Sequence, residues 1–381
     1  MKYCTHCVMP DTKPDLIIDK EGICNACRNY ESRVVVNWSK RELELRKILN
    51  KYQSKNSQWD CIVPVSGGKD STFQVVRMLE YGMHPLCVTG TTCDLSDIGR
   101  KNIQNIKNLG VDYLEFSPNP IVRRKLNYVG LTEVGDISWP EHLSIFTIPT
   151  RVAVQYNIPL IIWGENSQNE YGGPKHAASN SVLTNRRWLE EFGGLLGLRL
   201  TDLIGVEGLT QKDLAPYVYP TEEEFNKVGI TGLFLGHYLP WDGYVNSLIA
   251  QAHGFTTYSK NVEGSIVNYE NLDNYQTGIH DYFKYLKFGF SRATDIACLH
   301  VRRGRLTRKD AVKIVRFTDG KFPWEYLGKS LEKILEPLDL SVAEFISLCD
   351  RFTNKDIFLT DKSGNLIKDK QGNLTKKLYA E

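Results

Sequence analysis

The chain has 381 residues, a length typical of two or three domains. Charged residues make up 24% and hydrophobic residues 41%, which excludes a largely disordered protein. The net charge of +2 gives no global attraction for nucleic acid, and neither a hydrophobic leader nor a membrane-length apolar run is present. We therefore expect a cytoplasmic globular protein with no membrane or nucleic-acid partner.

Residues 1–35 contain two Cys-x-x-Cys pairs, formed by Cys4, Cys7, Cys24 and Cys27. Four thiolates at this spacing are typical of a zinc ribbon, in which the metal substitutes for a core that so short a segment lacks. A redox role is the alternative for such pairs, and iron is the alternative metal. The spacing favours structural Zn²⁺.

Residues 36–253 begin with an amphipathic linker helix, expected over 39–57. Apolar strands then alternate with helical segments, which predicts a doubly wound parallel α/β sheet of five strands. The expected strands are 61–65, 85–89, 111–116, 158–163 and 232–237, and the expected helices are 71–81, 96–109, 143–156 and a last one ending near 253.

A glycine-rich loop stands between the first strand and its helix and consists of Ser66, Gly67, Gly68, Lys69, Asp70 and Ser71. Two adjacent glycines let backbone N–H groups approach phosphate oxygens, and the helix N-terminus and Lys69 add positive charge. The serines supply hydroxyls, and Asp70 either caps the helix or holds Mg²⁺. The loop is not a Walker loop, because Val63 occupies the position of its first glycine.

Ligands of doubly wound sheets bind beyond the carboxyl ends of the strands, so the loops after other strands are further candidates. These loops contribute Gly90, Thr91, Gly164, Glu165, Asn166, Glu170 and Tyr171, and His142 precedes the helix before the fourth strand. Carboxylate and amide groups there could ligate Mg²⁺ or orient a substrate amide; the alternative is a solvent-facing turn. Cys93 lacks a recognisable base partner, so we interpret it as a half-buried residue rather than a nucleophile.

The rest of the chain is less regular. Residues 175–230 are expected to form an insertion that covers the site, and 254–352 a mainly helical C-terminal region. In that region Lys287 and Arg292 could clamp a phosphate, although such residues are often plain helix faces. The tail, 353–381, repeats a turn pattern and predicts a small polar β-meander or a frayed end.

Several motifs together resemble a known family. SGGKDS resembles the PP-loop of ATP pyrophosphatases, which have the adenine nucleotide alpha hydrolase-like fold. The ordered set of zinc ribbon, VSGGKDST, SWPEH, IPLIIWGEN, EYGG and YLKFGFSRATD is similar to that of N-acetyl-sugar amidotransferases, the WbpG-like and pseudaminic-acid group of bacterial surface-polysaccharide biosynthesis, including LPS O-antigen and nonulosonic acids. The resemblance runs from Cys4 to about Pro323, and Ser291 departs from it where glycine is expected.

The resemblance implies that ATP is cleaved to AMP and pyrophosphate while a sugar acetamido group becomes an acetamidino group. An amide oxygen is a poor leaving group, so the amide would first be adenylated, and ammonia would then displace AMP. Lys69 would stabilise the departing pyrophosphate, Asp70 and Glu165 would hold Mg²⁺, and Gly90 and Thr91 would help to hold the adenosine. The expected substrate is an N-acetylated, nucleotide-linked sugar.

The ammonia source is expected to be a separate protein. Lys2 follows the initiator Met where one glutaminase class needs cysteine, and no cysteine outside the ribbon stands in a Gly-x-Cys-x-Gly elbow. The resemblance implies a glutaminase subunit of the histidine-biosynthesis type, with a cyclase-like companion.

Two other functions stay open. A tRNA-thiolating or tRNA-modifying PP-loop enzyme is the first, although thiolases usually carry a catalytic cysteine pair that is absent here and the charge is balanced. The second is a zinc-ribbon docking module whose nucleotide site only senses ATP. Pyrophosphate release would separate an enzyme from such a sensor.

Overall fold

The computed structural model describes residues 1–33, 35–53, 59–165, 182–183 and 196–381. Its main sheet has the strand order β3-β2-β1-β4-β6-β5, in which the first five strands are parallel and β5 (Val182–Leu183) is an antiparallel edge strand. The parallel strands are β1 (Cys61–Pro64), β2 (Pro85–Gly90), β3 (Asp112–Phe116), β4 (Leu160–Trp163) and β6 (Thr231–Phe234). The prediction of a five-stranded parallel sheet is confirmed.

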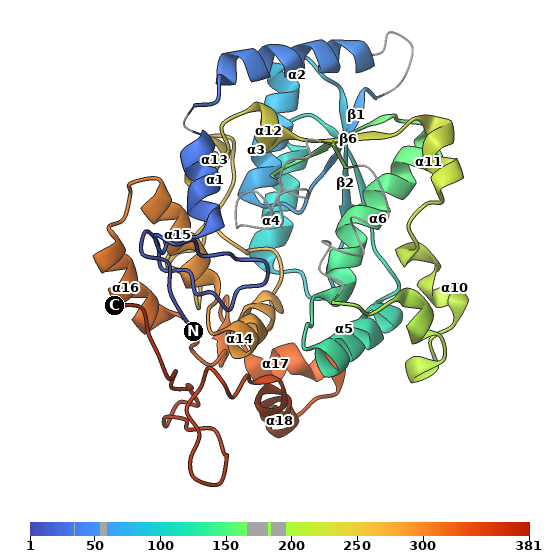
Figure 1. Cartoon of the computed structure of the whole chain (residues 1–381). Helices are drawn as coiled ribbons and strands as arrows, with labels where there is room; N and C mark the ends of the chain where they lie inside the picture. The colour runs from blue at the N-terminus through green and yellow to red at the C-terminus, as the bar shows by residue number, and fades with distance from the viewer. Residues whose placement is uncertain (34, 54–58, 166–181, 184–195) are drawn as a thin grey trace.

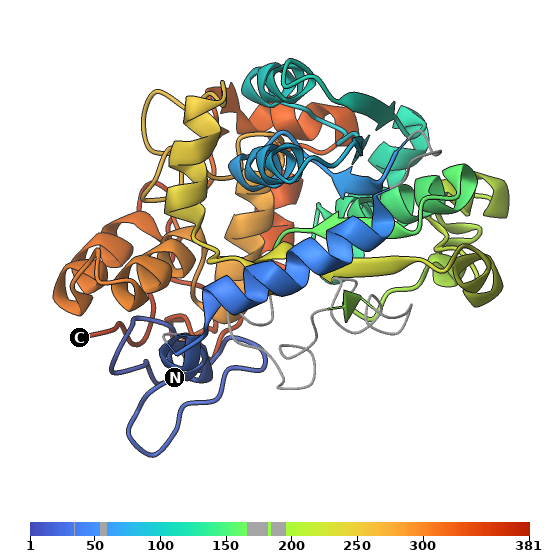
Figure 2. The same cartoon turned by 90° about the horizontal axis from the view of Figure 1, so that it is seen from above.

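Helices cover both faces of this sheet, as alternating strand residues require. Along β1, Cys61 and Val63 lie in one apolar cluster and Ile62 in another. The first cluster is shared with α2 (Trp38–Tyr52), α3 (Lys69–Glu80), α4 (Asp97–Lys107) and α13 (Gly243–Ala252), and the second with α6 (Trp139–Tyr156) and α11 (Glu222–Val228) (Figures 1 and 2). Because both faces are buried there, β1 and β4 are continuously apolar, whereas the edge strand β3 is partly exposed and includes Asp112 and Glu115.

Two helices differ from expectation. The helix expected over 143–156 begins at Trp139, because Pro140 is tolerated in a first helical turn. A further helix, α5 (Pro120–Val134), was not expected; Asn119 caps it by accepting a hydrogen bond from the Ile121 N–H at 2.9 Å. Asparagine followed by proline is a helix-start signal, and it was present in the sequence.

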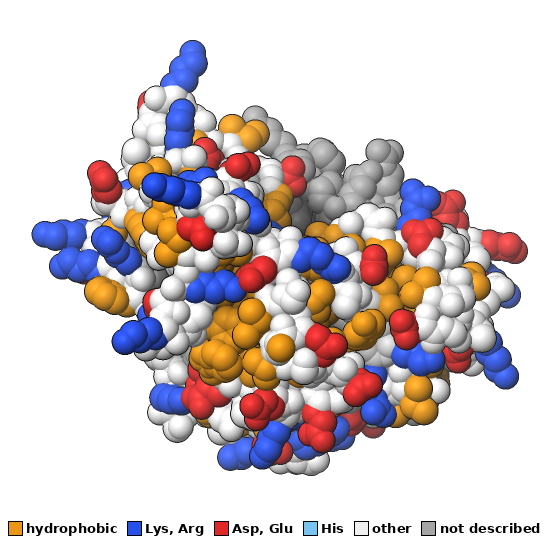
Figure 3. Space-filling view, turned by 90° about the horizontal axis from the view of Figure 1, so that it is seen from below, with side chains coloured by type: hydrophobic (Ala, Val, Ile, Leu, Met, Phe, Trp, Pro, Cys, Tyr) orange, Lys and Arg blue, Asp and Glu red, His pale blue; other side chains and the backbone are white. Residues whose placement is uncertain are grey.

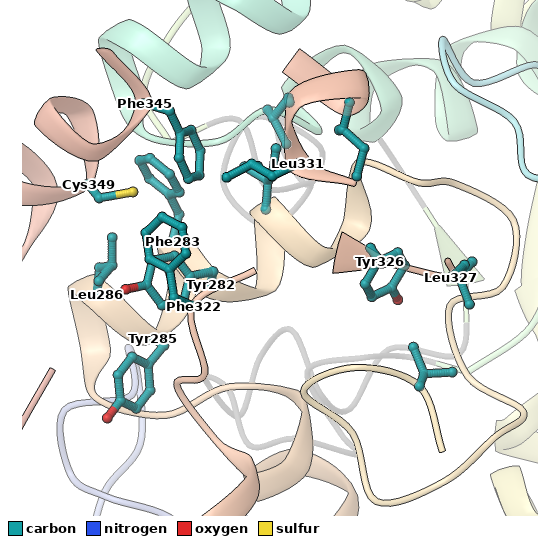
Figure 4. Packing of buried hydrophobic residues seen from close by; sticks show 14 of the residues in the cluster. Tyr282, Phe283, Tyr285, Leu286, Phe322, Tyr326, Leu327, Leu331, Phe345 and Cys349 are labelled. Atoms are coloured by element: carbon teal, nitrogen blue, oxygen red, sulfur yellow. The ribbon is translucent and has the colours of Figure 1, made fainter. Parts of the chain in front are cut away.

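The C-terminal region is mainly helical, as predicted. It contains α14 (Thr277–Phe288), α15 (Arg292–Arg302), α16 (Arg308–Thr318), α17 (Leu331–Leu335) and α18 (Val342–Phe352), with a short hairpin of β7 (Glu325–Tyr326) and β8 (Lys329–Ser330). Its core is an aromatic cluster in which Phe283, Phe322 and Phe345 meet, with ring centroids 5.9 Å apart for Phe283–Phe345 and for Phe322–Phe345 (Figure 4). Most of this core comes from the region itself, and Leu131, Ile137 and Ala250 of the α/β domain join it.

The N-terminal segment packs against that region. Its helix α1 (Asn25–Arg33) and the four cysteines share an apolar cluster with Phe290, Ala297 and Val315 of the C-terminal region. The Arg308 guanidinium of α16 donates to the carbonyl of Cys7 at 3.1 Å and to that of Cys4 at 3.3 Å. In Figure 1 the N-terminal segment accordingly lies beside α15 and α16.

The remaining described segments are short. Residues 196–230 include α10 (Gln211–Leu214) and several turns, α12 (Leu235–Tyr238) follows β6, and the rest of the expected insertion lies outside the described residues. In the tail, Asp361 and Asp369 each close a turn by accepting backbone hydrogen bonds. Among the described helices none is long and apolar enough to span a membrane. Basic and acidic side chains are interspersed on the face shown in Figure 3.

Candidate functional site

The glycine-rich loop lies at the carboxyl end of β1, next to α4. Gly67 has φ +90°, a conformation that favours glycine, and an added Cβ would lie 3.1 Å from the Ile103 backbone nitrogen. Gly68 is the residue before the first turn of α3. The sheet order reverses direction between β1 and β4, so the loop stands at the switch point where doubly wound sheets bind ligands.

The hydroxyls of the loop serve its own backbone in this structure. Ser66 is exposed, and its Oγ accepts from the Gly68 N–H at 3.2 Å. Ser71 is buried, and its Oγ donates to the Gly68 carbonyl at 2.9 Å. Ser66 is therefore the more accessible of the two predicted hydroxyls.

Lys69 is the charged centre of the loop. It is only 5% exposed, and its Nζ lies 2.6 Å from Asp70 Oδ2 and 2.6 Å from Glu270 Oε1. Burial opposes its charge, but the two carboxylates outweigh burial and raise the pKa of Lys69. The ammonium is therefore charged at neutral pH.

Asp70 and Glu270 are held from other parts of the chain. Asn246 of α13 donates its Nδ2 hydrogen to Asp70 Oδ1 at 2.8 Å, and Gly243 lets that helix approach, since a Cβ there would lie 3.2 Å from Lys69 Cε. Glu270 belongs to the C-terminal region. The sequence did not reveal Asn246 or Glu270, because only the folded arrangement brings them to the loop.

A C-terminal segment, residues 269–276, closes the same side of the sheet. The Ser96 N–H donates to the Asp273 carbonyl at 3.0 Å, and the Tyr275 N–H donates to the Asp94 carbonyl at 3.0 Å. Lys329 Nζ also lies 2.7 Å from Asp94 Oδ1. The C-terminal region thus docks onto the loop after β2, at the carboxyl edge of the sheet.

Two other groups near this crevice have shifted pKa values. Burial, and then the charge of Glu141, raise the pKa of Asp273. Burial, and then Glu141, also raise the pKa of Cys93 to about 11. The Cys93 thiol is therefore protonated at neutral pH, which agrees with its interpretation as a half-buried residue and not a nucleophile.

The predicted residues after β2 and β4 lie at the carboxyl edge. Gly90 packs against α6, where a Cβ would lie 3.2 Å from Ile148 Cγ1, and the Thr91 N–H donates to the Phe116 carbonyl at 2.9 Å. A Cβ on Gly164 would lie 2.7 Å from Gln74 Nε2. Buried Gln74 extends from α3 toward β4, and its Oε1 has no hydrogen-bond partner among the described residues.

Among the predicted substrate residues that the structure describes, Lys287 and Arg292 contact other groups of the protein. Lys287 Nζ donates to the Val134 carbonyl at 2.7 Å, and Arg292 forms an ion pair with Asp281 at 3.1 Å. Glu165 is half-buried at the end of β4, with its Cα near Gly236. Asn166, Glu170 and Tyr171 lie outside the described residues. These substrate contacts stay predictions.

The residues around the loop fit a magnesium nucleotide. Asp70 and Glu270 place two carboxylates beside a loop whose N–H groups and helix end favour anions. A triphosphate would be repelled by these carboxylates unless a divalent cation lay between them, and Mg²⁺ takes oxygen ligands of this kind. Asp70 and Glu270 are therefore the candidate ligands among the described residues.

The four ribbon cysteines fit a tetrahedral metal. All four are buried and their sulfurs lie within 4.8 Å of one another. Cys7 Sγ and Cys24 Sγ are 3.8 Å apart, which is about the separation of two thiolates each ~2.3 Å from one zinc ion. The N–H groups of Cys7 and Cys24 point at Cys4 Sγ at 3.4 and 3.3 Å, as backbone groups do around metal-bound thiolates.

A second group with ligand chemistry lies near the start of α6. Asp136 Oδ1 is 2.7 Å from His280 Nδ1, and Asp136 Oδ2 is 3.2 Å from His142 Nδ1. His142 was predicted as a substrate contact; the structure places it in this cluster.

Comparison with known proteins finds one family model that matches part of the chain. The model of the family described as LPS biosynthesis protein WbpG-like, C-terminal domain, matches residues 254–371. No curated protein sequence matches the chain.

Among solved structures, the chain is similar to an NH3-dependent NAD synthetase from Campylobacter jejuni (13% identity, 51% of this chain and 95% of that one, TM-score 0.29). It is also similar to an NMN synthetase from Francisella tularensis (14% identity, 51% of this chain and 93% of that one, TM-score 0.26). A third similar structure is that of the tRNA thiolase NcsA from Methanococcus maripaludis (12% identity, 93% of this chain and 97% of that one, TM-score 0.28).

The fold assignment rests on the order and direction of the strands and on the loop at the switch point. The family match begins at residue 254, where the mainly helical region was expected to begin, and includes Glu270. The chain therefore joins a doubly wound α/β domain, with the glycine-rich loop at its switch point, to a C-terminal region that matches the model of the WbpG-like C-terminal domain.

Proposed function

We propose that the protein is an ATP-dependent amidotransferase that converts the acetamido group of a nucleotide-linked sugar into an acetamidino group. The observation that carries the proposal is the ion pair between Lys69 of the PP-loop and Glu270 of the WbpG-like domain, 2.6 Å apart. One domain supplies a nucleotide loop and the other completes it, so the nucleotide and the family-specific substrate would share a crevice.

The chemistry follows from the charges around that crevice. The amide oxygen of the substrate attacks the α-phosphorus of ATP, the bond to pyrophosphate breaks, and an adenylated imidate forms. Lys69 and the N–H groups of the loop stabilise the negative charge that develops on pyrophosphate. Ammonia then adds to the imidate carbon, loses a proton, and AMP leaves with the former amide oxygen. Mg²⁺ would supply charge neutralisation when bound beside Asp70 and Glu270.

Sulfur transfer to tRNA is less well supported by the residues. Cys61, Cys87, Cys298 and Cys349 are buried at no more than 3% exposure, and the pKa of Cys93 is raised by burial. The four buried thiols lack the access that a sulfur carrier needs, and the raised pKa of Cys93 disfavours its thiolate form. We propose instead that ammonia comes from a separate glutaminase of the histidine-biosynthesis type, with a cyclase-like companion, in surface-polysaccharide biosynthesis in the cytoplasm.

The test is a product assay with ATP, Mg²⁺ and ammonium, offering UDP- and CMP-linked N-acetyl sugars beside bulk tRNA. We expect AMP and pyrophosphate in equal amounts with one sugar, and a small mass decrease of that sugar. Turnover with tRNA alone would replace the proposal with the RNA-modifying function, and nucleotide binding without turnover would favour the sensor.

A charge-removing variant links the activity to the loop. Lys69→Met should lower the rate of pyrophosphate release roughly 10²–10³-fold, because it removes a cation from the transition state. Lys227→Met changes an exposed lysine of α11 in the same way and should leave the rate unchanged. A similar rate in both variants would contradict the role of Lys69.

A further inference from the structure

Asp136, His142 and His280 bring three metal-ligating groups together outside the PP-loop and the ribbon. One ligand atom from each lies within 4.8 Å of the other two. The His280 Nδ1–Asp136 Oδ1 distance is 2.7 Å, the His142 Nδ1–Asp136 Oδ2 distance is 3.2 Å, and the two imidazole centroids are 5.3 Å apart. Both rings therefore place Nδ1 within ion-pair distance of one carboxylate.

The three residues come from two parts of the chain. Asp136 lies in the turn between α5 and α6, and His142 in the first turn of α6. His280 lies in the first turn of α14, in the WbpG-like domain, 144 residues after Asp136. A helix that connects parallel strands starts at the carboxyl edge of the sheet, so the cluster lies on the same side as the PP-loop.

Burial gives the cluster an inner and an outer side. The Asp136 side chain is 5% exposed, and its Oδ1 also accepts from the Ser138 N–H at 2.9 Å. The His142 and His280 side chains are 26% and 24% exposed. The carboxylate is thus fixed from inside, while both imidazoles are partly exposed to solvent.

The distances are near those of ligands around one ion. Ligand atoms ~2.0–2.1 Å from a tetrahedral zinc ion lie about 3.3 Å from one another, close to the 3.2 Å between His142 and Asp136. The shorter distance, between His280 Nδ1 and Asp136 Oδ1, is that of a hydrogen bond. A small rotation of the imidazole would lengthen it to the separation of two metal ligands. Two imidazoles and a carboxylate form a recognised zinc ligand set that leaves a fourth position for water or substrate.

We propose that Asp136, His142 and His280 form a second metal site, which takes a divalent transition-metal ion such as Zn²⁺ with one coordination position open. The ion would connect α6 to α14 and thereby fasten the WbpG-like domain to the α/β domain. This site differs from the four-cysteine site in ligand chemistry and in its open position. It is independent of the proposed function, since it requires only the three side chains.

The test is the zinc stoichiometry of the full chain, measured by mass spectrometry of the metal after saturation with Zn²⁺ and removal of excess by gel filtration. We expect His142→Gln and His280→Gln each to bind one equivalent less than the wild type. His84→Ala removes an exposed histidine that pairs with a carboxylate, Asp112, at 3.5 Å, and should bind as much as the wild type.

A second measurement, the melting temperature with and without Zn²⁺, tests the site also in variants that fold poorly. Zn²⁺ should raise the melting temperature of the wild type through its binding to the folded state, and this increase should be smaller in both glutamine variants. Stoichiometry and zinc-dependent melting that are the same in the wild type and in both variants would overturn the proposal. So would an equal loss of zinc in His84→Ala.

Discussion

Glu270 is the residue on which the link between the two domains depends. Its carboxylate reaches Lys69 from the C-terminal region, and Asp70 reaches the same ammonium from the loop. A lysine held by two carboxylates keeps its charge despite burial, and its direction is fixed before the nucleotide arrives. Such preorganisation is how charged groups lower a barrier without rearranging during the reaction.

Glu270→Gln should therefore lower the rate of pyrophosphate release by about tenfold, the effect of losing one hydrogen bond to a charged group. The apparent requirement for Mg²⁺ should rise as well, because a candidate ligand is lost. Initial rates across a Mg²⁺ titration measure both effects. Glu332→Gln alters an exposed glutamate of α17 and serves as the matched control. An unchanged rate and Mg²⁺ dependence in Glu270→Gln would remove this residue from the site.

Asp319 makes a prediction about stability and pH. Burial raises its pKa to about 6, while the Ser291 N–H at 2.9 Å and the Thr294 hydroxyl partly offset this effect. The folded state then binds a proton more tightly than the unfolded state, whose carboxyl has a pKa of ~3.9. The free energy of unfolding should consequently fall as pH rises from about 4 to about 6, by roughly 3 kcal/mol.

Asp319→Asn removes this titration. In urea unfolding, the stability of the wild type relative to the variant should be greater at pH 4 than at pH 8. A difference that stays constant, or that changes in the opposite direction, would show that Asp319 is not protonated at low pH in the folded protein.

At the scale of elements, the loop depends on how closely α3 and α4 approach. Gly67 stands against the backbone of α4, and its positive φ adds a second reason for glycine. This close approach fixes the position of the loop relative to α4.

Gly67→Ala should abolish most pyrophosphate release, because its Cβ would displace the loop from Ile103. Gly110→Ala provides the control: it has nearly the same φ, +86°, with nothing within 4 Å of the added Cβ. Both variants should lose about 1–2 kcal/mol of stability through backbone strain, measured by chemical unfolding. If the two variants had equal activity, the displacement of the loop from Ile103 would not be what lowers pyrophosphate release.

The elements that could be predicted are those with local signals. The five strands follow from apolar runs, and the PP-loop from six consecutive residues. Asn119 and Pro120 are a helix-start signal for α5. The irregular hydrophobic pattern of the residues that follow obscured this signal. Glu270 and the partnership of Asp136 with His280 had no local signal, because they depend on how the C-terminal region docks.

At the scale of the whole molecule, the ribbon is part of the C-terminal half of the structure. Its cysteines pack with residues of α15 and α16, and Arg308 donates to two of its carbonyls. The two ends of the chain thus meet on one side of the α/β domain (Figure 1). A metal in the ribbon would therefore stabilise more than the first 35 residues.

Cys27→Ser should lose one equivalent of zinc and lower the melting temperature by about 5 °C or more, because metal binding contributes folding free energy. Cys298→Ala is the control, since this buried thiol of α15 packs in the same cluster but is not one of the four. It should keep the metal and lose only packing. Loss of zinc in Cys298→Ala, or its retention in Cys27→Ser, would contradict the assignment of the four ligands.

The most direct test of the amidotransferase account follows the amide oxygen itself. The substrate sugar is prepared with a heavy oxygen isotope in its acetyl group and turned over with ATP and ammonium. The account predicts that the label appears in the phosphate of AMP, because that oxygen attacks the α-phosphorus and leaves with it. Label that stays in the sugar, or AMP that carries none, would contradict adenylation of the amide.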